Sequence, residues 1–429
     1  MRVAVIGTGY VGLVTGVVLA DLGNDVICVD IDPHKVAMLK QGKSPIYEPG
    51  IEEMLVRGLR SNHLSISDSV AEATKASDIV FIAVGTPQSP DGAPDMKYVI
   101  AAATEIGRAV DHYVIVVNKS TVPVGSGTLV AETIAGQGVS ADLFDIVSNP
   151  EFLREGSAIR DTLQPDRIVI GASNPIAAQR VSDLYATIDA PKIITDVNSA
   201  ELIKYGSNSF LAMKISFINA ISRICEACEA DVSKVAEGMG ADKRIGRPFL
   251  NAGLGWGGSC FPKDVAGMIN IAAKFGYDFK LLKEVVAIND DQTLHFVDRI
   301  RRRLGGLKGK RIALMGLAFK PDTDDIRDAK SLVMIREILN EGGSVVAYDP
   351  IAAENVRQVF PDIEYANNTQ ELASGADALV LVTEWNEFRQ IDLARLSRLL
   401  KQPLLFDGRR IYAKKVAEEA GFEYCCVGG

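Results

Sequence analysis

Residues 2–12 constrain the fold of this chain more than any other segment, because they read Arg-Val-Ala-Val-Ile-Gly-Thr-Gly-Tyr-Val-Gly. The short apolar run predicts a strand buried on both faces, and the glycines after it open an apolar helix that extends to about Leu22. A second strand from Asn24 to Asp30 completes a β-α-β unit. Such a unit predicts an α/β domain with a parallel sheet.

The second half of the chain repeats this order. A strand over 311–315 runs into Gly316, a helix extends from about Ala329 to Asn340, and another strand covers 344–349. Two more pairs of segments resemble each other in the same order, namely 76–84 with 375–382 and 113–118 with 403–407. We therefore expect an α/β fold with two Rossmann-like, doubly wound parallel-sheet domains.

The middle of the chain has helical periodicity from about Ser199 to Glu229 and again beyond Pro262, which predicts a long central helix. The apolar residues of this helical region fit a homodimer interface, and they fit a core within one chain equally well. We expect three regions: an N-terminal Rossmann domain over 1–197, a central helical or dimerisation region over 198–300, and a C-terminal Rossmann-like domain over 301–429.

The composition is that of a globular protein, with 47% hydrophobic and 24% charged residues among 429, a length that predicts two or three domains. A net charge of −9 argues against non-specific binding of nucleic acid, which depends on neutralising phosphates. No apolar run is long enough to span a membrane. We expect neither nucleic acid nor a membrane as a partner.

The six cysteines do not form a disulfide framework in so long a chain, which favours a cytoplasmic location. The glycines of residues 7–12 interrupt the apolar N-terminus, so a signal peptide is not expected. Cys225 and Cys228 have the spacing of half a zinc site, but no second pair matches it, and we expect no metal.

The segment Gly7-Thr8-Gly9-Tyr10-Val11-Gly12 fits the dinucleotide fingerprint, since it follows a strand, opens a helix and precedes an acidic strand end at Asp30. The carboxylate of Asp30 would accept hydrogen bonds from a ribose hydroxyl and repel a 2′-phosphate, which favours NAD over NADP. Lys35 could reach the ribose or a phosphate. The second half has Gly316-Leu317-Ala318 instead, so we expect it to bind something other than a second dinucleotide.

Cys260 stands in a glycine-rich turn, Gly255-Trp256-Gly257-Gly258-Ser259-Cys260, at the start of an expected helix with Pro262 as its first residue. The positive end of a helix dipole favours a thiolate. Cys260 is therefore a candidate nucleophile. A buried structural cysteine in a tight turn is the alternative.

Lys204 and Asn208 lie four residues apart on the expected long helix, so their side chains project from one face. An ammonium beside an amide can hold an oxyanion or a water. Glu151, within Asn149-Pro150-Glu151, fits a general base. It also fits a favourable acid at a helix start capped by Asn149.

Taken together, these segments resemble the UDP-glucose/GDP-mannose dehydrogenase family over nearly the whole length. The resemblance rests on the residues 7–12 fingerprint, Gly85-Thr86-Pro87, Lys119-Ser120-Thr121, 149–156, Lys204 with Asn208, 249–253, the Cys260 turn, 319–323 and Asp407-Gly408-Arg409. Trp256 departs from it, since the family more often has phenylalanine or tyrosine there. Phe261 and the 249–253 loop are similar to the UDP-glucose branch.

The resemblance implies NAD-dependent oxidation of the C6 alcohol of UDP-glucose to the carboxylate of UDP-glucuronate, with two NAD and one water. Cys260 would attack the aldehyde to give a thiohemiacetal, and a second oxidation would leave a thioester for hydrolysis. By similarity, Lys204 and Asn208 stabilise the oxyanion. Asp264 with Thr121 positions a water, and Glu151 is the base in hydrolysis. Asp264, or Lys204 through a water, is the candidate that deprotonates the alcohol.

The resemblance also implies binding roles. NAD contacts are implied for Gly7, Gly9, Tyr10, Val11, Gly12, Asp30, Lys35, Thr86, Pro87, Thr121, Glu155 and Arg327. Substrate contacts are implied for Phe152, Leu153, Arg154, Glu155, Lys204, Asn208, Phe249, Leu250, Asn251, Gly253, Gly257, Phe261, Lys320 and Arg409, and for Arg244 reached from a neighbouring subunit. The protein would then be a homodimer.

Three alternatives stay open. The substrate is GDP-mannose or another nucleotide sugar, or the chain is a single-step hydroxyacid dehydrogenase, or it is a sensor that binds nucleotide sugars without turnover. The number of NADH formed per substrate separates the second alternative from a two-step oxidation.

Overall fold

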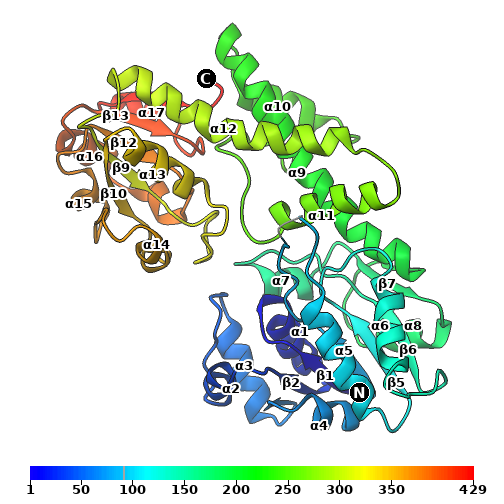
Figure 1. Cartoon of the computed structure of the whole chain (residues 1–429). Coiled ribbons are helices and arrows are strands. Elements are labelled where there is room, and N and C mark those ends of the chain that lie inside the picture. Colours follow the sequence, from blue (N-terminus) through cyan, green and yellow to red (C-terminus); the bar gives the residue numbers. More distant parts are fainter. Residues whose placement is uncertain (90–91) are drawn as a thin grey trace. The chain divides into compact units, whose positions relative to one another are not determined.

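The computed structural model describes residues 1–89 and 92–429, which form two compact units. Unit 1 comprises Met1–Ser207 and Ala266–Phe275, and unit 2 comprises Asn208–Val265 and Gly276–Gly429. Each unit contains one sheet, and the expected α/β fold with two parallel-sheet domains is confirmed (Figure 1).

The sheet of unit 1 has eight strands in the order β3-β2-β1-β4-β5-β6-β7-β8, with every neighbouring pair parallel except β6 and β7. Its strands are β1 (Arg2–Ile6), β2 (Asp25–Val29), β3 (Leu64–Ser67), β4 (Ile79–Ile82), β5 (Val114–Asn118), β6 (Phe144–Ser148), β7 (Ile168–Ala172) and β8 (Lys192–Thr195). The first six follow the strand order of dinucleotide-binding sheets.

Helices cover this sheet, so strand β1 is buried on both faces. Val3 and Val5 belong to one apolar cluster of the core, and Ala4 and Ile6 belong to another. The helices are α1 (Tyr10–Asp21), α2 (Pro33–Lys40), α3 (Ile51–Arg60), α4 (Val70–Lys75), α5 (Lys97–Ala109), α6 (Ser126–Ala135), α7 (Ala158–Leu163) and α8 (Pro175–Asp183). Burial on both sides explains why β1 is apolar without alternation.

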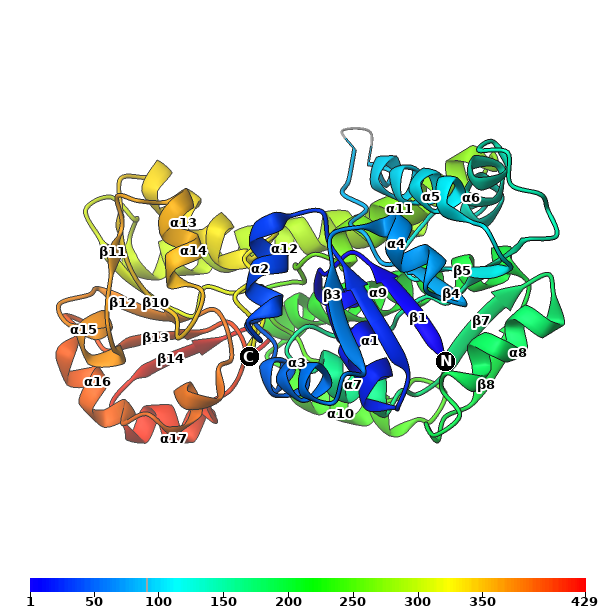
Figure 2. The same ribbon diagram turned by 90° about the horizontal axis from the view of Figure 1, so that it is seen from below.

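The sheet of unit 2 has six parallel strands in the order β11-β10-β9-β12-β13-β14, so it repeats the order of the first six strands of unit 1. Figure 2 shows this sheet, coloured from yellow to red, with helices around it. Its strands are β9 (Arg311–Met315), β10 (Ser344–Tyr348), β11 (Glu364–Tyr365), β12 (Ala378–Leu381), β13 (Leu404–Asp407) and β14 (Glu423–Cys426). Its helices are α13 (Lys330–Asn340), α14 (Ala353–Val359), α15 (Thr369–Ala373), the 3-10 helix η1 (Asn386–Gln390), α16 (Leu393–Leu399) and α17 (Lys414–Glu419).

The middle of the chain is helical, as the periodicity predicts. It contains α9 (Val197–Cys228), α10 (Val232–Ala241), α11 (Phe261–Lys274) and α12 (Lys280–Leu304). The expected long helix over about 199–229 is therefore α9, and it contributes residues to both units. Within the described part of the chain, no helix combines the length and the apolar character that crossing a bilayer requires.

Candidate active site

The three glycines after β1 have distinct structural needs. Gly7 has a φ of +97°, and a Cβ there would lie 2.7 Å from the Ala83 oxygen. A Cβ on Gly12 would lie 1.9 Å from the Gly7 oxygen, so only glycine lets α1 pack this closely. A Cβ on Gly9 would meet nothing within 4 Å. The open space at Gly9, directly before the N-terminus of α1, fits the approach of a pyrophosphate.

Asp30 directly follows β2 and is linked to this turn. Its Oδ2 accepts hydrogen bonds from the Thr8 backbone N at 3.0 Å and from the Thr8 Oγ1 at 2.5 Å, and its Oδ1 accepts one from the Asp32 N at 3.0 Å. Burial raises the pKa of Asp30, but these hydrogen bonds outweigh it and hold the pKa below its ordinary value. Lys35 Nζ lies 4.0 Å from the carboxylate. The residues fit an NAD ribose at this strand end.

Thr86 and Thr121 are brought together at the carboxyl ends of β4 and β5, where Thr86 Oγ1 donates to the Thr121 backbone oxygen at 2.9 Å. Glu155 is buried at 7% exposure. Carboxyl ends of parallel strands are where doubly wound sheets bind ligands. Four expected NAD contacts, the glycine turn, Asp30, Thr86 and Thr121, therefore belong to strand ends of one sheet.

Glu151 and Lys204 form a buried ion pair in unit 1. Lys204 Nζ lies 2.7 Å from Glu151 Oε1, and the two side chains are 3% and 6% exposed. Glu151 Oε2 accepts a hydrogen bond from the Leu153 N at 2.9 Å, and Lys204 Nζ lies 5.6 Å from the centre of the Phe152 ring. The structure thus joins the expected base directly to the expected oxyanion-holding lysine.

Lys119 is a further buried lysine to which the sequence assigned no role. Its Nζ donates to Asn149 Oδ1 at 3.0 Å, and the Tyr185 hydroxyl donates to the same oxygen at 2.7 Å. The pKa of Lys119 is lowered to about 8, chiefly by burial, while the charge of Glu151 raises it and the charge of Lys204 lowers it. A charged residue directly after the apolar strand β5 was the signal that could have revealed it.

The interpretation of Asn149 as a helix cap is wrong. No helix begins at Glu151, and α7 starts only at Ala158. The amide of Asn149 instead donates to the Val169 oxygen of the neighbouring strand β7 at 2.7 Å, while its oxygen accepts from Lys119 and Tyr185. The side chain is therefore used for tertiary hydrogen bonds and is not available as a cap.

In unit 2, Cys260 directly precedes α11. The helix begins at Phe261, so Pro262 is its second residue and not its first, as the sequence had suggested. The Cys260 oxygen accepts a hydrogen bond from the Asp264 N at 2.8 Å, which places Cys260 at the cap of the helix. Cys260 is partly exposed, whereas Cys28 is buried in the core. Burial raises the pKa of Cys28 to about 12. A helix N-terminus favours a thiolate at Cys260.

Asp264 is the buried carboxylate of this helix start, at 1% exposure. Asn208 Nδ2 donates to its Oδ2 at 2.6 Å, and Lys263 Nζ lies 3.4 Å from its Oδ1. Lys204 and Asn208, one turn apart on α9, are therefore each bonded to a carboxylate: Glu151 in unit 1 and Asp264 in unit 2.

The glycines before Cys260 pack against the loop that joins β9 to α13. Gly258 N donates to the Arg327 oxygen at 2.8 Å, and a Cβ on Gly257 would lie 2.2 Å from the Asp328 oxygen. Arg327 is paired with Asp325 at 2.7 Å. The cysteine turn and the loop that bears Lys320 and Arg327 are thus in direct contact within unit 2.

Arg409 approaches the same turn from the end of β13. Its Nη1 reaches the Gly255 oxygen at 3.5 Å, while its Nε donates to the Val382 oxygen at 2.6 Å and lies 3.2 Å from Glu384. Phe249, with an unusual φ of +65°, lies 6.3 Å from the Phe261 ring. The Arg409 side chain and the Arg327 backbone therefore contact the glycine turn, and the Phe249–Phe261 pair joins the segments on either side of it in the sequence.

Three other expected residues are exposed, and a fourth is buried in the apolar core of unit 2. Arg244 has a side-chain exposure of 89% and pairs with Asp242, and Arg154 has one of 63% and pairs with Asp161. Asn251 is exposed, while Leu250 is buried at 2%.

The glycine turn, the acid after β2 and the six-strand order define unit 1 as a dinucleotide-binding domain of the dehydrogenase type. Comparison with known proteins gives the family. The chain matches, in order, the UDP-glucose/GDP-mannose dehydrogenase family's NAD binding domain at residues 1–189, its central domain at 198–291 and its UDP binding domain at 313–414. The chain belongs to this family of NAD-dependent oxidoreductases.

Curated relatives match over the full length. The chain is 46% identical over 428 residues to UDP-glucose 6-dehydrogenase TuaD of Bacillus subtilis, covering 100% of this chain and 93% of that protein. It is 45% identical to UDP-glucose 6-dehydrogenase of Rhizobium meliloti, covering 100% and 99%. Among solved structures, a UDP-glucose dehydrogenase from the archaeon Pyrobaculum islandicum superimposes with a TM-score of 0.93 at 42% identity, covering 99% of this chain and 97% of that one.

Proposed function

We propose that this protein is a UDP-glucose 6-dehydrogenase that oxidises the C6 alcohol of UDP-glucose to the carboxylate of UDP-glucuronate. The observation that carries the proposal is Cys260, partly exposed at the N-terminus of α11 and in a glycine turn bordered by Arg327 and Arg409. Basic groups around such a turn fit a diphosphate. Full-length relatives that bear this enzyme name support the substrate.

The family resemblance supplies the proposed chemistry, and the residues present fit it. NAD, when bound, supplies the hydride acceptor, and one substrate needs it twice. The Cys260 thiolate attacks the C6 aldehyde, so a sulfur–carbon bond forms as the carbonyl π bond becomes an oxyanion. Lys204 and Asn208 hold that oxyanion. The thiohemiacetal keeps the aldehyde bound to the enzyme and so prevents its escape. Oxidation of the thiohemiacetal by the second NAD leaves a thioester.

Hydrolysis returns the thiolate. We assign Glu151 as the base that takes a proton from the attacking water, since its carboxylate is held by Lys204 and by the Leu153 N. Asp264 with Thr121 would position the water. For the first step, the base that takes the alcohol proton is Asp264, or Lys204 through a water.

Substrate and cofactor contacts complete the proposal. NAD would lie on the glycine turn of 7–12 with Asp30, Lys35, Thr86, Pro87, Thr121 and Glu155, and the resemblance also implies an NAD contact for Arg327. The sugar nucleotide contacts 152–155, the 249–257 loop, Phe261, Lys320 and Arg409.

The test is stoichiometry. With UDP-glucose as the limiting substrate, two NADH per sugar are expected, and one NADH would instead indicate a single-step dehydrogenase. A panel with UDP-galactose, GDP-mannose and UDP-N-acetylhexosamines tests specificity, and turnover with GDP-mannose alone would overturn the assignment. A chain that binds UDP-glucose with no NADH formation would be a sensor.

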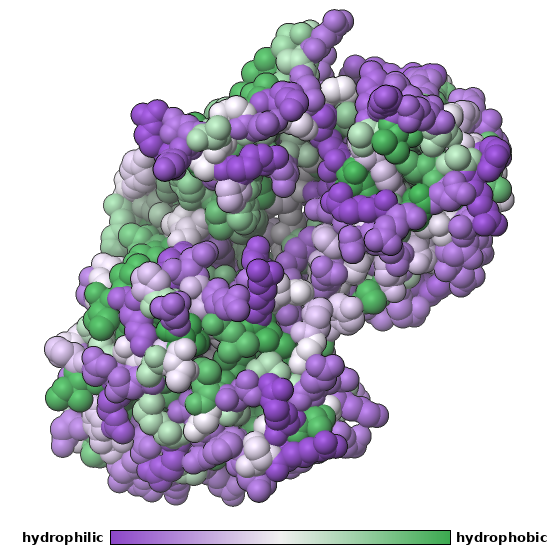
Figure 3. Space-filling view, turned by 180° about the vertical axis from the view of Figure 1, so that it is seen from behind, coloured by the Kyte–Doolittle hydropathy of each residue, from purple (hydrophilic) through white to green (hydrophobic). Residues whose placement is uncertain are grey.

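We further propose a cytoplasmic homodimer formed through the 198–300 region. Phe210, Phe217 and Ile224 lie at every seventh position of α9 and are 59%, 50% and 60% exposed, a spacing that places them on one stripe of the helix. Apolar patches are visible on the mostly hydrophilic surface in Figure 3. The exposed Arg244 would reach the partner's substrate. Phe217→Glu should give monomers in sedimentation analysis, and a monomeric wild type would remove the proposal.

A further inference from the structure

Residues 253–256, which lead into the cysteine turn, are buried without belonging to a helix or a strand. Leu254 and Trp256 are 0% and 7% exposed. Buried backbone groups must find partners, and an irregular segment cannot supply them from its own neighbours. The partners of this segment therefore show what holds it in place.

Helix α12 provides most of these partners from a single face. Asn289 Oδ1 accepts from the Trp256 N at 2.7 Å, and its Nδ2 donates to the Trp256 oxygen at 3.1 Å. Gln292 Nε2 donates to the Gly253 oxygen at 3.0 Å, and Thr293 Oγ1 donates to the Leu254 oxygen at 2.8 Å. All three side chains are 1% exposed, and positions 289, 292 and 293 share one face of a helix.

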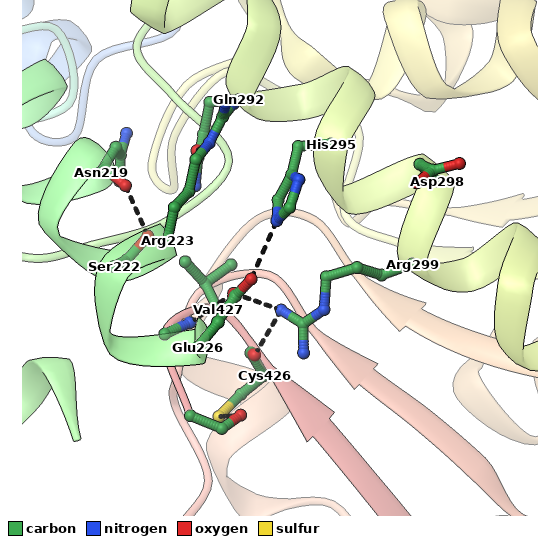
Figure 4. A network of polar contacts seen from close by, with 12 residues as sticks. Asn219, Ser222, Arg223, Glu226, Gln292, His295, Asp298, Arg299, Cys426 and Val427 are labelled. Carbon is green, nitrogen blue, oxygen red and sulfur yellow. Dashed lines mark hydrogen bonds and ion pairs between the residues drawn. The ribbon is translucent and has the colours of Figure 1, made fainter. Parts of the chain in front are cut away.

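Helix α9 supplies the remaining partners. Asn219 Oδ1 accepts from the Gly253 N at 2.8 Å, and Ser216 Oγ accepts from the Trp256 indole N at 3.0 Å. Arg223 Nε donates to Gln292 Oε1 at 3.0 Å, which fixes the orientation of that amide. Figure 4 shows Arg223 of α9 beside Gln292 of α12.

The fit admits one register of the segment. Gly255 has a φ of +113°, and a Cβ there would lie 2.7 Å from Asn289 Oδ1. Asn289 therefore bonds both main-chain polar groups of Trp256 and also excludes any side chain at Gly255. Because Trp256 is only four positions before Cys260, the placement of the thiol depends on this contact.

We propose that Asn289 is a positioning residue for the Cys260 nucleophile. It acts through the main chain of Trp256, with Gln292 and Thr293 supporting it, and so α12 sets where the thiol stands at the start of α11. The expected effect on turnover rests on the proposed function, whereas the expected effect on the reactivity of the Cys260 thiol does not.

The first test measures the thiol without substrate. Asn289→Ala and Asn289→Asp are compared with wild type and with Asn340→Asp, which makes the same amide-to-acid change at an exposed position of α13. Iodoacetamide alkylation of the Cys260 peptide is followed by mass spectrometry over a pH series. The midpoint should rise by about half a unit or more in both Asn289 variants, because the thiolate loses its fixed place at the helix N-terminus.

The second test measures turnover with UDP-glucose and NAD. Misplacement of a reacting group by about 1 Å costs about a hundredfold, so kcat should fall about tenfold to a hundredfold in the Asn289 variants. The KM for NAD should stay within about twofold of the wild-type value, because the expected NAD contacts belong largely to unit 1. Thr293→Val, which removes one bond, should shift both readouts less, and Thr293→Ser should restore them.

Each result decides. Wild-type midpoint and kcat in a folded Asn289→Ala overturn the proposal. So does a lower melting temperature with an unchanged alkylation midpoint, since that describes a purely structural residue. If the Asn289 variants do not fold, Thr293→Val against Thr293→Ser decides by the same midpoint. A wild type without turnover would contradict the proposed function but not the positioning role of Asn289, because the alkylation test needs no turnover.

Discussion

The two sheets begin with the same turn and then diverge. Gly7 and Gly316 have φ values of +97° and +96°, and a Cβ on either would collide with the end of the fourth strand, at the Ala83 oxygen or the Thr383 N. In unit 1, α1 starts at Tyr10, three residues after Gly7. In unit 2, α13 starts at Lys330, fourteen residues after Gly316. The same backbone turn therefore serves a helix N-terminus in one unit and a long loop in the other.

The acids after the second strands differ in the same way. Asp349 accepts five hydrogen bonds, from the backbone of Leu317, Ala318, Ile351 and Ala352 and from the Trp385 indole. Asp30 accepts three, from Thr8 and Asp32. A carboxylate has about four lone-pair sites, so Asp349 is saturated whereas Asp30 retains capacity for a ribose. This explains in physical terms why only unit 1 fits a dinucleotide.

The largest effect is expected from Gly12→Val, which tests whether the glycine turn of unit 1 holds NAD. A Cβ at this position would lie 1.9 Å from the Gly7 oxygen, so α1 must move away from the turn. NAD binding should weaken at least about a hundredfold, equivalent to about 2.7 kcal/mol, with UDP binding unchanged. Titration calorimetry with each ligand checks this.

Gly9→Ala is the matched control for that variant. Its Cβ meets nothing within 4 Å, so the melting temperature should stay at the wild-type value while NAD still weakens. Retained NAD affinity in Gly12→Val would show that the turn does not carry the pyrophosphate.

The paired variants Asp30→Asn and Asp349→Asn test whether the acids after the second strands of the two sheets have different roles. Asp30→Asn should weaken NAD about tenfold and destabilise unit 1 by about 1 kcal/mol, because Asp30 accepts three hydrogen bonds where Asp349 accepts five. Asp349→Asn should leave NAD affinity intact but destabilise unit 2 by about 2–3 kcal/mol, because hydrogen bonds to a buried charge are lost. Hydrogen exchange of β9 and β10 together with NAD titration separates the two effects, and equal behaviour of the two variants would refute the distinction.

Sequence reasoning recovered the repeat because it is written in local pattern. Strands buried on both faces are apolar throughout, as Val3–Ile6 and Ile79–Ile82 are, and glycines mark the turns. The fold class, the family and NAD as the cofactor are confirmed by the structure and the comparisons. The individual roles of the expected site residues remain predictions.

The parts that sequence reasoning missed depend on contacts between distant positions. Lys119 and its partner Asn149 are 30 positions apart, and Glu151 and Lys204 are 53 apart. The segment Asn289-Asp290-Asp291-Gln292-Thr293 is entirely polar and drew no prediction from the sequence, yet three of its members bind buried backbone. A polar side chain that satisfies a remote main chain leaves no periodic signal.

A pH experiment tests the carboxyl edge of unit 1. Glu201, 2% exposed, accepts from Gly125 N at 2.7 Å and Gly127 N at 2.9 Å, at the start of α6. Burial raises the pKa of Glu201 to about 7 against these hydrogen bonds. Because the folded pKa lies above the unfolded one, its favourable contribution is present below about 4.3 and is lost as the pH rises through about 7.

Glu201→Gln should therefore remove that pH dependence. The free energy of unfolding of wild type, relative to the variant, should fall by up to about 3 kcal/mol between pH 4.5 and pH 8. Urea unfolding of both proteins over this range checks the result. A constant difference would mean that Glu201 is ionised throughout.

The smallest effect is expected where the two sheets agree, at their amino edge. Asp78 bonds to Arg2 at 2.6 Å, and Asp377 in the matching position accepts from the Arg311 N at 2.8 Å and lies 3.1 Å from Lys401. The bond from Arg2 lowers the pKa of Asp78. For Asp377, the bonds from Arg311 and Lys401 lower the pKa and outweigh burial, which raises it. Both groups therefore stabilise above their unfolded pKa and lose that contribution as the pH falls.

Asp78→Asn should cost only about 0.5 kcal/mol at neutral pH, since partly exposed ion pairs contribute little. Asp377→Asn should cost about 1 kcal/mol, because Asp377 is buried and also accepts a hydrogen bond from the Arg311 backbone. Ligands bind doubly wound sheets at the opposite, carboxyl edge, so NADH production should not change. Denaturant unfolding and steady-state turnover of the two variants check both statements. A loss of activity in either variant would contradict a purely structural role of the amino edge, and the functional difference between the two sheets would then not be confined to their carboxyl edges.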